Sequence, residues 1–195
     1  MRDRHAVRGD WGEGEWEGRE REETMKTPTF VALDFETADH GRDSACAVGI
    51  VKVRGTRIIH EAAYLIRPPR RTFCFSYLHG IIWEDVAEKP CFRSVWLKIR
   101  PILNDAEFLV AHNASFDSSV LEACCAAARI RPPELGFHCT MRLARQTWGI
   151  YPTRLPDVCR RLRLPLDHHD PLSDARACAQ IVIQVIEAGV FPGSY

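Results

Sequence analysis

A short run near the start of the chain carries two carboxylates at a spacing that suits metal chemistry. Residues 30–37 read Phe-Val-Ala-Leu-Asp-Phe-Glu-Thr, which begins as a buried strand and ends with Asp34 and Glu36. Because side chains alternate along a strand, the two carboxylates lie on one face. Two like charges beside an apolar sheet repel each other and resist desolvation, so a divalent cation would compensate them. The alternative is that both carboxylates cap the strand in solvent, since motifs this short recur by chance.

A further acidic side chain follows a second buried strand. Residues 108–112 form an apolar run, and a helix rich in Ala and Leu is expected over residues 114–129, with Asp117 in its early turns. The end of a strand beside the start of a helix is where α/β sheets place ligands. Taken alone, Asp117 also suits a helix-dipole role, which is the commoner one for an acid near a helix N-terminus.

The last acidic candidate lies on the inward face of the final helix, expected over residues 171–187. Asp174 shares a helical stripe with Cys178 and Ile181, four and seven residues later, and this stripe is apolar. A carboxylate on a core-facing stripe is costly unless it has a partner. We therefore interpret Asp174 as a ligand rather than a solvated charge.

The elements that must position these side chains follow from periodicity and turn residues. Two β-rich runs, residues 45–53 and 57–66, flank a hairpin turn, and the stretch from Pro68 to Pro90 is expected to be irregular. Asp170 is the expected N-cap of the last helix. A meander followed by alternating helix and strand predicts one domain of the α/β or α+β class, with a mixed sheet covered by helices. Further helices are expected over residues 92–103, 142–148 and 156–162.

Composition describes an ordinary folded chain. The 195 residues are enough for one domain with a substantial core, 46% are hydrophobic and 27% charged, and acidic and basic residues number 26 each. The first 26 residues hold six of the basic and eight of the acidic residues, which leaves 20 basic and 18 acidic residues after them. With several of those acids assigned to a metal site, the remaining surface weakly favours a polyanionic partner.

The eight cysteines contain no CxxC pair and mostly fall within apolar or helical patterns, so we expect reduced core residues of an intracellular protein. A zinc site of Cys139 with His138 or His168 fits no standard ligand spacing. No apolar run approaches the roughly 20 residues that a membrane span needs, and the N-terminus lacks the apolar segment of a signal peptide. We expect a cytoplasmic location without membrane contact.

Residues 1–26 differ from the rest of the chain. They are dense in Gly, Glu and Arg and lack a sustained apolar period, so they cannot bury enough surface to offset their ordering entropy. We expect a disordered leader or a non-native extension, with Met25 as a candidate native start. The folded domain is expected over residues 28–190.

Together these residues resemble the three motifs of the DEDDh class, the superfamily of 3′–5′ exonucleases that includes the epsilon proofreading subunit of DNA polymerase III. The matching positions are Asp34-x-Glu36, then His-Asn-Ala-x-Phe-Asp at residues 112–117, then His169 followed five residues later by Asp174. The resemblance implies a ribonuclease H-like fold, with a five-stranded mixed sheet flanked by helices, and makes residues 28–190 an exonuclease domain. Further similarity to stand-alone bacterial epsilon-like exonucleases lies at residues 32–38, 65–69, 79–81 and 139–140.

The resemblance implies a metal site and a list of ligands for it. Oxygen-rich sites suit hard cations, and paired metals stabilise both the attacking and the leaving oxygen of a phosphodiester displacement. Two divalent cations, Mg²⁺ or Mn²⁺, are implied. Their ligands would be Asp34, Glu36, Asp117 and Asp174.

His169 is implied as the general base, because an imidazole with an ordinary pKa of about 6.5 titrates close to working pH. The five-residue offset to Asp174 matches the family for His169, whereas His168 is interpreted as a flanking or substrate-side residue. Asn113 is expected to cap the helix that follows it, and His112 to be a satisfied, partly buried histidine.

The resemblance also implies contacts to the 3′-terminal nucleotide from Thr37 and Ala38, just after the first motif. A wedge against the terminal base is expected from Phe116 or from the loop that contains His79, because stacking on an aromatic or apolar face tolerates any base. Core packing is the alternative role for Phe116. Residues that would either track phosphates or simply be solvated are Arg42, Arg70 and Arg71.

Three functions compete at this point. The favoured one is a metal-dependent 3′–5′ exonuclease that hydrolyses single-stranded or frayed DNA by a two-metal mechanism and releases nucleoside 5′-monophosphates. The second is an exoribonuclease of the same class, since no residue settles whether a 2′-hydroxyl is accepted. The third is a non-catalytic, polymerase-associated module that binds nucleic acid, which the intact chemical positions disfavour. Because the chain ends at Tyr195, soon after the last helix, we expect a stand-alone nuclease, with a DNA polymerase partner left open.

Overall fold

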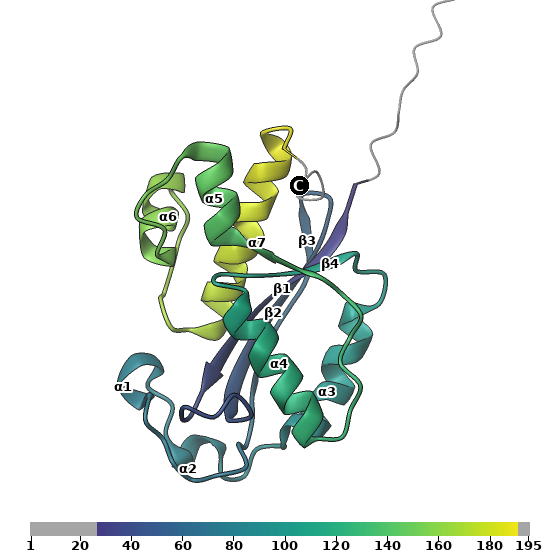
Figure 1. Ribbon diagram of the computed structural model, residues 1–195, viewed down its shortest axis with the longest axis vertical. Coiled ribbons are helices and arrows are strands. Elements are labelled where there is room, and N and C mark those ends of the chain that lie inside the picture. The colour runs from purple at the N-terminus through teal and green to yellow at the C-terminus, as the bar shows by residue number, and fades with distance from the viewer. Residues whose placement is uncertain (1–26, 191–195) are drawn as a thin grey trace, which may run out of the picture.

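A five-stranded mixed sheet forms the centre of the computed structural model, which describes residues 27–190 (Figure 1). The expectations for residues 1–26 therefore lie outside the described part of the chain. The strand order is β3-β2-β1-β4-β5, with antiparallel pairs among the first three strands and parallel pairs from β1 through β4 to β5. The expected sheet is confirmed. Its strands are β1 (Thr29–Thr37), β2 (Ala45–Arg54), β3 (Arg57–Leu65), β4 (Phe108–Ala111) and β5 (Phe137–Cys139).

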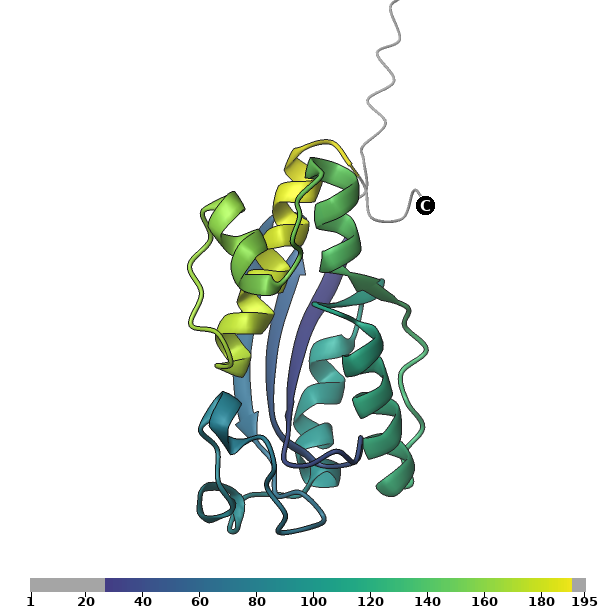
Figure 2. The same ribbon diagram turned by 60° about the vertical axis from the view of Figure 1, so that its left-hand side comes forward.

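Helices cover both faces of this sheet. They are α1 (Ser76–His79), α2 (Trp83–Val86), α3 (Phe92–Ile99), the short 3-10 helix η1 (Arg100–Leu103), α4 (Ser115–Ala127), α5 (Thr140–Trp148), α6 (Leu155–Leu162) and α7 (Pro171–Glu187). One face packs against α3 and α4, and the other packs against α7, with α5 and α6 stacked beside it (Figures 1 and 2). The short α1 and α2 lie near the end of β1, beyond the sheet.

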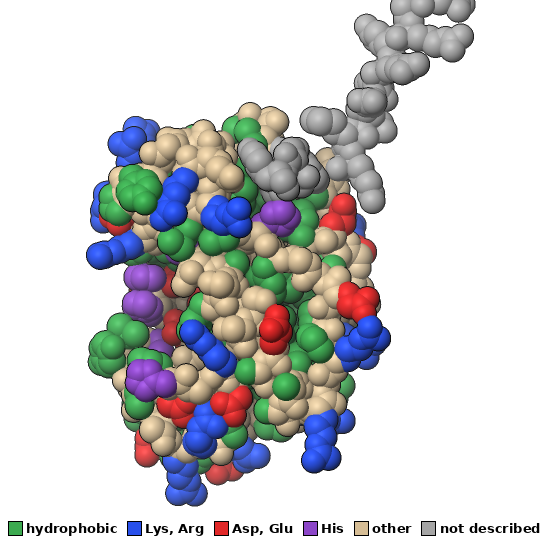
Figure 3. Space-filling model, viewed as in Figure 1, with side chains coloured by type: hydrophobic (Ala, Val, Ile, Leu, Met, Phe, Trp, Pro, Cys, Tyr) green, Lys and Arg blue, Asp and Glu red, His purple; other side chains and the backbone are tan. Residues whose placement is uncertain are grey.

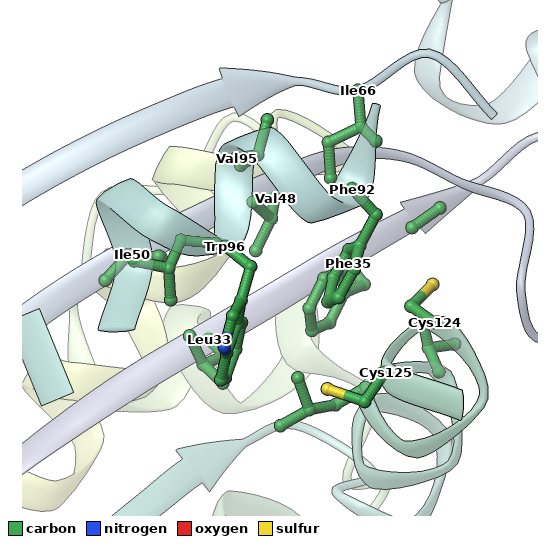
Figure 4. Packing of buried hydrophobic residues seen from close by; sticks show 14 of the residues in the cluster. Leu33, Phe35, Val48, Ile50, Ile66, Phe92, Val95, Trp96, Cys124 and Cys125 are labelled. Atoms are coloured by element: carbon green, nitrogen blue, oxygen red, sulfur yellow. The ribbon is translucent and has the colours of Figure 1, made fainter. Parts of the chain in front are cut away.

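The period of two along β1 decides which helix faces the acidic motif. Leu33 and Phe35 point to the α3 and α4 side, where they pack with Trp96 and Cys125 (Figure 4). The intervening residues point to the opposite side, where Ala32 belongs to the core against α7. Because Asp34 and Glu36 continue the Ala32 face of the strand, they are directed toward α7 rather than toward α3 or α4.

A close approach of α7 to the sheet depends on Gly49. This residue is paired with Asp34 across β1 and β2, and a Cβ added to it would overlap the carbonyl of Pro171. The expected cap of α7 is confirmed, since the Asp170 carboxylate accepts a hydrogen bond of 2.7 Å from the Ser173 amide. The first turn of α7 is thus held against β2 at the strand position that faces Asp34.

The structure adds elements that the sequence pattern did not indicate. β5 is only three residues long, too short for a readable period, and it is ordered by parallel pairing with β4. The stretch expected to be irregular contains α1 and α2, each four residues long. The hairpin turn between β2 and β3 is confirmed, and Gly55 takes the left-handed φ of 61° that this turn requires.

All eight cysteines are free. Five of them are buried, as expected for core residues, whereas Cys74 and Cys91 are exposed, because they lie in the loops before α1 and α3. Among residues 27–190, the clusters of side chains arranged like metal ligands contain no cysteine. No helix in this part of the chain is long and apolar enough to cross a bilayer.

Candidate active site

Three of the acidic side chains meet at one edge of the sheet. Asp34 and Glu36 come from β1 and Asp174 from the first turn of α7, and one carboxylate oxygen of each lies within 4.8 Å of the others. The Asp174 side chain is 4% exposed and the Glu36 side chain 12% exposed. Residues 138 positions apart in the sequence are thereby brought into a single acidic cluster.

Asp117 joins this cluster from the opposite side of β1. It lies in the first turn of α4, is 2% exposed, and accepts a hydrogen bond of 3.0 Å from the amide of Phe35, the residue between Asp34 and Glu36. All four carboxylates line one cavity of about 520 Å³. Figure 3 shows acidic and histidine side chains gathered in a hollow at the left edge of the molecule.

The electrostatics of the cluster are unfavourable without a cation. Burial is the largest cause that raises the pKa of Asp34, followed by the negative charges of Asp117 and Asp174. Burial and the same two neighbours raise the pKa of Glu36 to about 8. Burial raises the pKa of Asp117 to about 7. Oxygen ligands in this number, gathered in one cavity, are the donor set that Mg²⁺ and Mn²⁺ prefer.

One fully buried oxygen of the cluster has no hydrogen-bond partner among residues 27–190. It is Asp174 Oδ1, whereas the second oxygen of this carboxylate, Oδ2, is held by two neighbours. A buried carboxylate oxygen without a donor is costly, and coordination of a cation would satisfy it. The residues therefore fit the divalent metal site that the sequence implied.

Two stacked histidines border the carboxylates. The rings of His168 and His169 lie 3.9 Å apart between centroids. His168, expected to flank the site, contacts it directly, with Nδ1 2.9 Å from Asp174 Oδ2. His169 adopts a left-handed φ of 73°, its amide donates to the same oxygen, and its Nδ1 lies 4.0 Å from Glu36 Oε1. Burial, and next the neighbouring His168, lower the pKa of His169.

The expectation for His112 is confirmed and that for Asn113 is wrong. His112 Nδ1 lies 2.7 Å from the Thr140 hydroxyl and Nε2 lies 2.8 Å from the Thr153 carbonyl, and burial lowers its pKa to about 4. Asn113 is not the cap of α4, because its backbone has a left-handed φ of 63° and Ala114 occupies the N-cap position. Both residues line the cavity.

The expected substrate contacts divide into two groups. Thr37 and Phe116 line the cavity. Ala38 does not: it is fully buried, its amide donates to the Ser44 carbonyl and its carbonyl accepts from the Cys74 amide. The expected contact of Ala38 with substrate is therefore not supported, because it has no exposed atom or unsatisfied backbone group to offer.

His79 lies behind the cavity wall rather than on it. Its Nδ1 accepts a hydrogen bond from the Ile81 amide, so the proton is on Nε2, which donates to the Thr37 carbonyl at 3.2 Å. This contact fixes the backbone at the end of β1 next to Glu36. His79 is thus placed to position the wall of the site.

Several wall residues were missed in the sequence. They come from short or irregular segments, where neither periodicity nor a motif marks them. α1 and the residue before it contribute apolar side chains on one side, and α5 with the start of α6 contributes the other side. These wall residues are Phe75, Leu78, Met141, Thr153, Arg154 and Leu155.

Comparison with known protein families gives one match over most of the chain. Residues 31–182 match the RNase_T family model, described as an exonuclease. The exonuclease family expected from the motifs is confirmed.

Two curated relatives are about a third identical to this chain over the residues that align with it. The chain is 33% identical over 168 residues to the PolC-type DNA polymerase III of Thermotoga maritima, a match that covers 84% of this chain and 12% of that protein. It is 30% identical over 151 residues to exodeoxyribonuclease 10 of Escherichia coli K12, covering 71% of this chain and 60% of that protein. The chain thus matches about an eighth of the length of the polymerase.

Solved structures with the same arrangement include exonuclease X in complex with 5′ overhanging duplex DNA. That structure is 25% identical, has a TM-score of 0.66, and the match covers 81% of this chain and 91% of that one. The nuclease domain of 3′hExo, a DEDDh family member bound to rAMP, has a TM-score of 0.72 at 18% identity, with coverage of 85% and 94%. The second likeness shows the shared fold.

Proposed function

The chain belongs to the RNase_T exonuclease family, and on that basis we propose that it hydrolyses phosphodiester bonds from the 3′ end of a nucleic acid strand and releases nucleoside 5′-monophosphates. The observation that carries this proposal is the meeting of Asp34, Glu36 and Asp174 within 4.8 Å, with Asp117 in the same cavity. We assign this domain to residues 28–190.

The metal ligands in this proposal are the four carboxylates. Two divalent cations, Mg²⁺ or Mn²⁺, would supply Lewis acidity, which lowers the pKa of a water molecule and neutralises charge on the scissile phosphate. Asp174 Oδ1, which has no hydrogen-bond partner within the described residues, is one coordinating atom in this assignment. The Phe35 amide holds Asp117 in place through Oδ1.

His169 is proposed as the general base. Its lowered pKa keeps the imidazole neutral near pH 7, so the ring is able to accept a proton from the attacking water. Nδ1 faces Glu36, and we assign the accepting role to Nε2. His168 is assigned a positioning role, since its Nδ1 contacts Asp174 Oδ2.

DNA is the proposed substrate, as single strands or frayed 3′ ends. The support is the 30% identity to exodeoxyribonuclease 10 and the likeness to exonuclease X in complex with duplex DNA. RNA is the second candidate, favoured by the likeness to 3′hExo bound to rAMP. The similarity to PolC-type polymerases makes association with a DNA polymerase a further proposal.

A paired assay tests the substrate assignment. DNA and RNA strands of one sequence, labelled at the 5′ end, are incubated with the protein in Mg²⁺ or Mn²⁺, and the products are separated by size. The proposal expects a ladder that shortens from the 3′ end, faster for DNA than for RNA. Faster RNA shortening would favour the exoribonuclease, and no shortening of either strand would favour a non-catalytic binding module.

A further inference from the structure

A row of cavities leads away from the candidate active site along residues 38–45. The cavity that holds the four carboxylates shares Thr37, Phe75 and Phe116 with a second one of about 250 Å³. A third cavity, of about 860 Å³, begins at Asp43, on the same loop. We call it the distal cavity, and the residues of its wall used below are Arg67, Arg71, Trp83, Glu88, Cys91 and Arg93.

A single arginine holds the loop between the second and third cavities in shape. The Arg70 guanidinium donates to Asp39 at 2.9 Å and to Asp43 at 2.6 Å. A Cβ added to Gly41 would overlap this guanidinium, so the loop closes tightly around it. Arg70, which the sequence left as either a phosphate contact or a solvated side chain, is instead engaged within the protein, where its one positive charge offsets half of the charge of the two aspartates.

Two other arginines along the row lie over aromatic rings. The Arg42 guanidinium is 4.5 Å from the ring centroid of Phe116, and the Arg71 guanidinium is 5.2 Å from that of Trp83. A guanidinium held over an aromatic ring presents donors to phosphate, and an aromatic face accepts any base by stacking. The same combination of groups therefore occurs beside the active site and again in the distal cavity.

The distal cavity carries positive charge that the described part of the chain leaves without ion-pair partners. Within residues 27–190, neither Arg67 nor Arg71 takes part in an ion pair. Arg67 has a long contact of 3.5 Å to the Ala87 carbonyl, and Arg93 donates to the Ala128 carbonyl. The acids of the wall are Asp43, which is paired with Arg70, and the exposed Glu88.

From these observations we propose that the distal cavity binds upstream nucleotides of the strand whose 3′ end lies among the carboxylates, with phosphates on Arg67 and Arg71 and a base on Trp83. This proposal rests on the proposed exonuclease function. The expected ligand is a nucleic acid strand, because groups that donate hydrogen bonds to phosphate and an aromatic face occur together. They also lie along a row of cavities that leads from the active site.

Binding measurements in EDTA test the proposal without hydrolysis. Fluorescence anisotropy gives the Kd of a labelled strand of about 12 nucleotides, long enough to occupy several sites of this kind, and of a dinucleotide. The double variant Arg67→Ala/Arg71→Ala is expected to weaken binding of the long strand about tenfold and to lower the slope of log K against log salt by about 0.7 for each arginine removed. The affinity of this variant for the dinucleotide should fall less than twofold.

Two further variants separate charge from stacking. Trp83→Phe keeps an aromatic face and is expected to bind the long strand nearly as well as the native protein, whereas Trp83→Ala should bind it several-fold more weakly. Arg57→Ala is the matched charge control, because Arg57 starts β3 at the end of the sheet opposite the carboxylates. It should leave both Kd and salt slope unchanged.

Cys91 provides a readout that does not depend on any variant. It is exposed on the wall of the distal cavity, and hydrogen bonds from Ser94 lower the pKa of its thiol, which favours alkylation. A strand of about 12 nucleotides should slow its alkylation by iodoacetamide severalfold, as read by peptide mass spectrometry. Protection by inorganic phosphate or by polyaspartate equal to that by the strand would overturn the proposal, since no base would then be recognised.

The outcomes distinguish this proposal from the proposed function. Hydrolysis of the p-nitrophenyl ester of thymidine 5′-monophosphate reports the carboxylate site alone. If the native protein hydrolyses this ester but Arg67→Ala/Arg71→Ala binds the long strand as tightly as the native protein, the distal site is wrong and the nuclease stands. If no phosphodiester is hydrolysed but binding and Cys91 protection depend on the arginines and Trp83, the nuclease is wrong and the distal site stands.

Discussion

Gly49 lies against the backbone carbonyl of Pro171, and no side chain fits between them. Gly49 is also paired with Asp34 across β1 and β2. The first turn of α7 carries Asp174, three residues after Pro171. The distance between the carboxylates of β1 and the carboxylate of α7 is therefore set by the absence of one methyl group on the neighbouring strand.

Gly49→Ala is predicted to push the first turn of α7 away from β2 and to separate Asp174 from Asp34. Hydrolysis should fall at least about tenfold, since misplacement of a reacting group by about 1 Å is enough to cost that much. The measurement is the rate of strand shortening in Mn²⁺, with the melting temperature recorded in parallel. Gly136→Ala is the matched control, because a Cβ at Gly136 would meet nothing within 4 Å. Full activity of a folded Gly49→Ala protein would show that this contact does not position Asp174.

His169→Ala is predicted to lower kcat by a factor of about 100 or more, the usual contribution of a general base, with little change in strand affinity. His168→Ala should lower kcat less, because the contact of His168 is to Asp174 and not to the attacking water in this account. Single-turnover rates and Kd values of both variants show which substitution lowers the rate of hydrolysis more. A larger loss for His168→Ala would transfer the role of base to His168.

The metal-free protein is predicted to lose stability as pH rises. Burial and neighbouring carboxylates raise the pKa of Glu36 to about 8 and raise that of Asp34 as well, so the folded state holds protons that the unfolded chain has released. A raised carboxyl pKa therefore stabilises the fold at low pH, and this contribution is lost as pH rises toward about 8. In EDTA the melting temperature should fall between about pH 5 and about pH 8.5, and Mn²⁺ should restore it at the upper end.

Glu36→Gln is the control for this pH dependence, since it removes one titrating charge and keeps the shape of the side chain. The fall in melting temperature in EDTA should become shallower. A melting temperature that rises with pH in EDTA, or that Mn²⁺ leaves unchanged, would contradict the assignment of the cluster as a cation site.

The sequence was most informative where a pattern was long or an acid sat on an apolar face. The period of two placed Asp34 and Glu36 on one side of β1, and the helical stripe placed Asp174 inward. β5 has three residues, too few for any period, and its order comes from pairing with β4. The close contact of Gly49 with Pro171 could not be predicted from the local sequence pattern, because it depends on how distant segments pack.

The site walls were harder to predict for the same reason. Leu78 lies in a short helix and Phe75 directly precedes it, within a stretch that the sequence predicted to be irregular. The backbone contacts of Ala38 do not follow from any periodic pattern in the sequence. The spacing of the motif assigned the role of base to His169 and not to His168. The turn before α7 nevertheless brings both rings to the acidic cluster. The motifs were enough to identify the candidate reacting groups. The residues around them could not be predicted, because they depend on tertiary packing.

The central claim is that four carboxylates converge to hold catalytic divalent cations, and Asp174→Asn tests it most directly. Mn²⁺ binding followed by electron paramagnetic resonance is measured beside release of mononucleotides, with Glu122→Gln on the exposed face of α4 as the control. The account predicts that Asp174→Asn binds Mn²⁺ far more weakly and loses hydrolysis by a factor of about 100 or more while remaining folded, and that Glu122→Gln matches the native protein. Native Mn²⁺ binding and native hydrolysis by Asp174→Asn would contradict it.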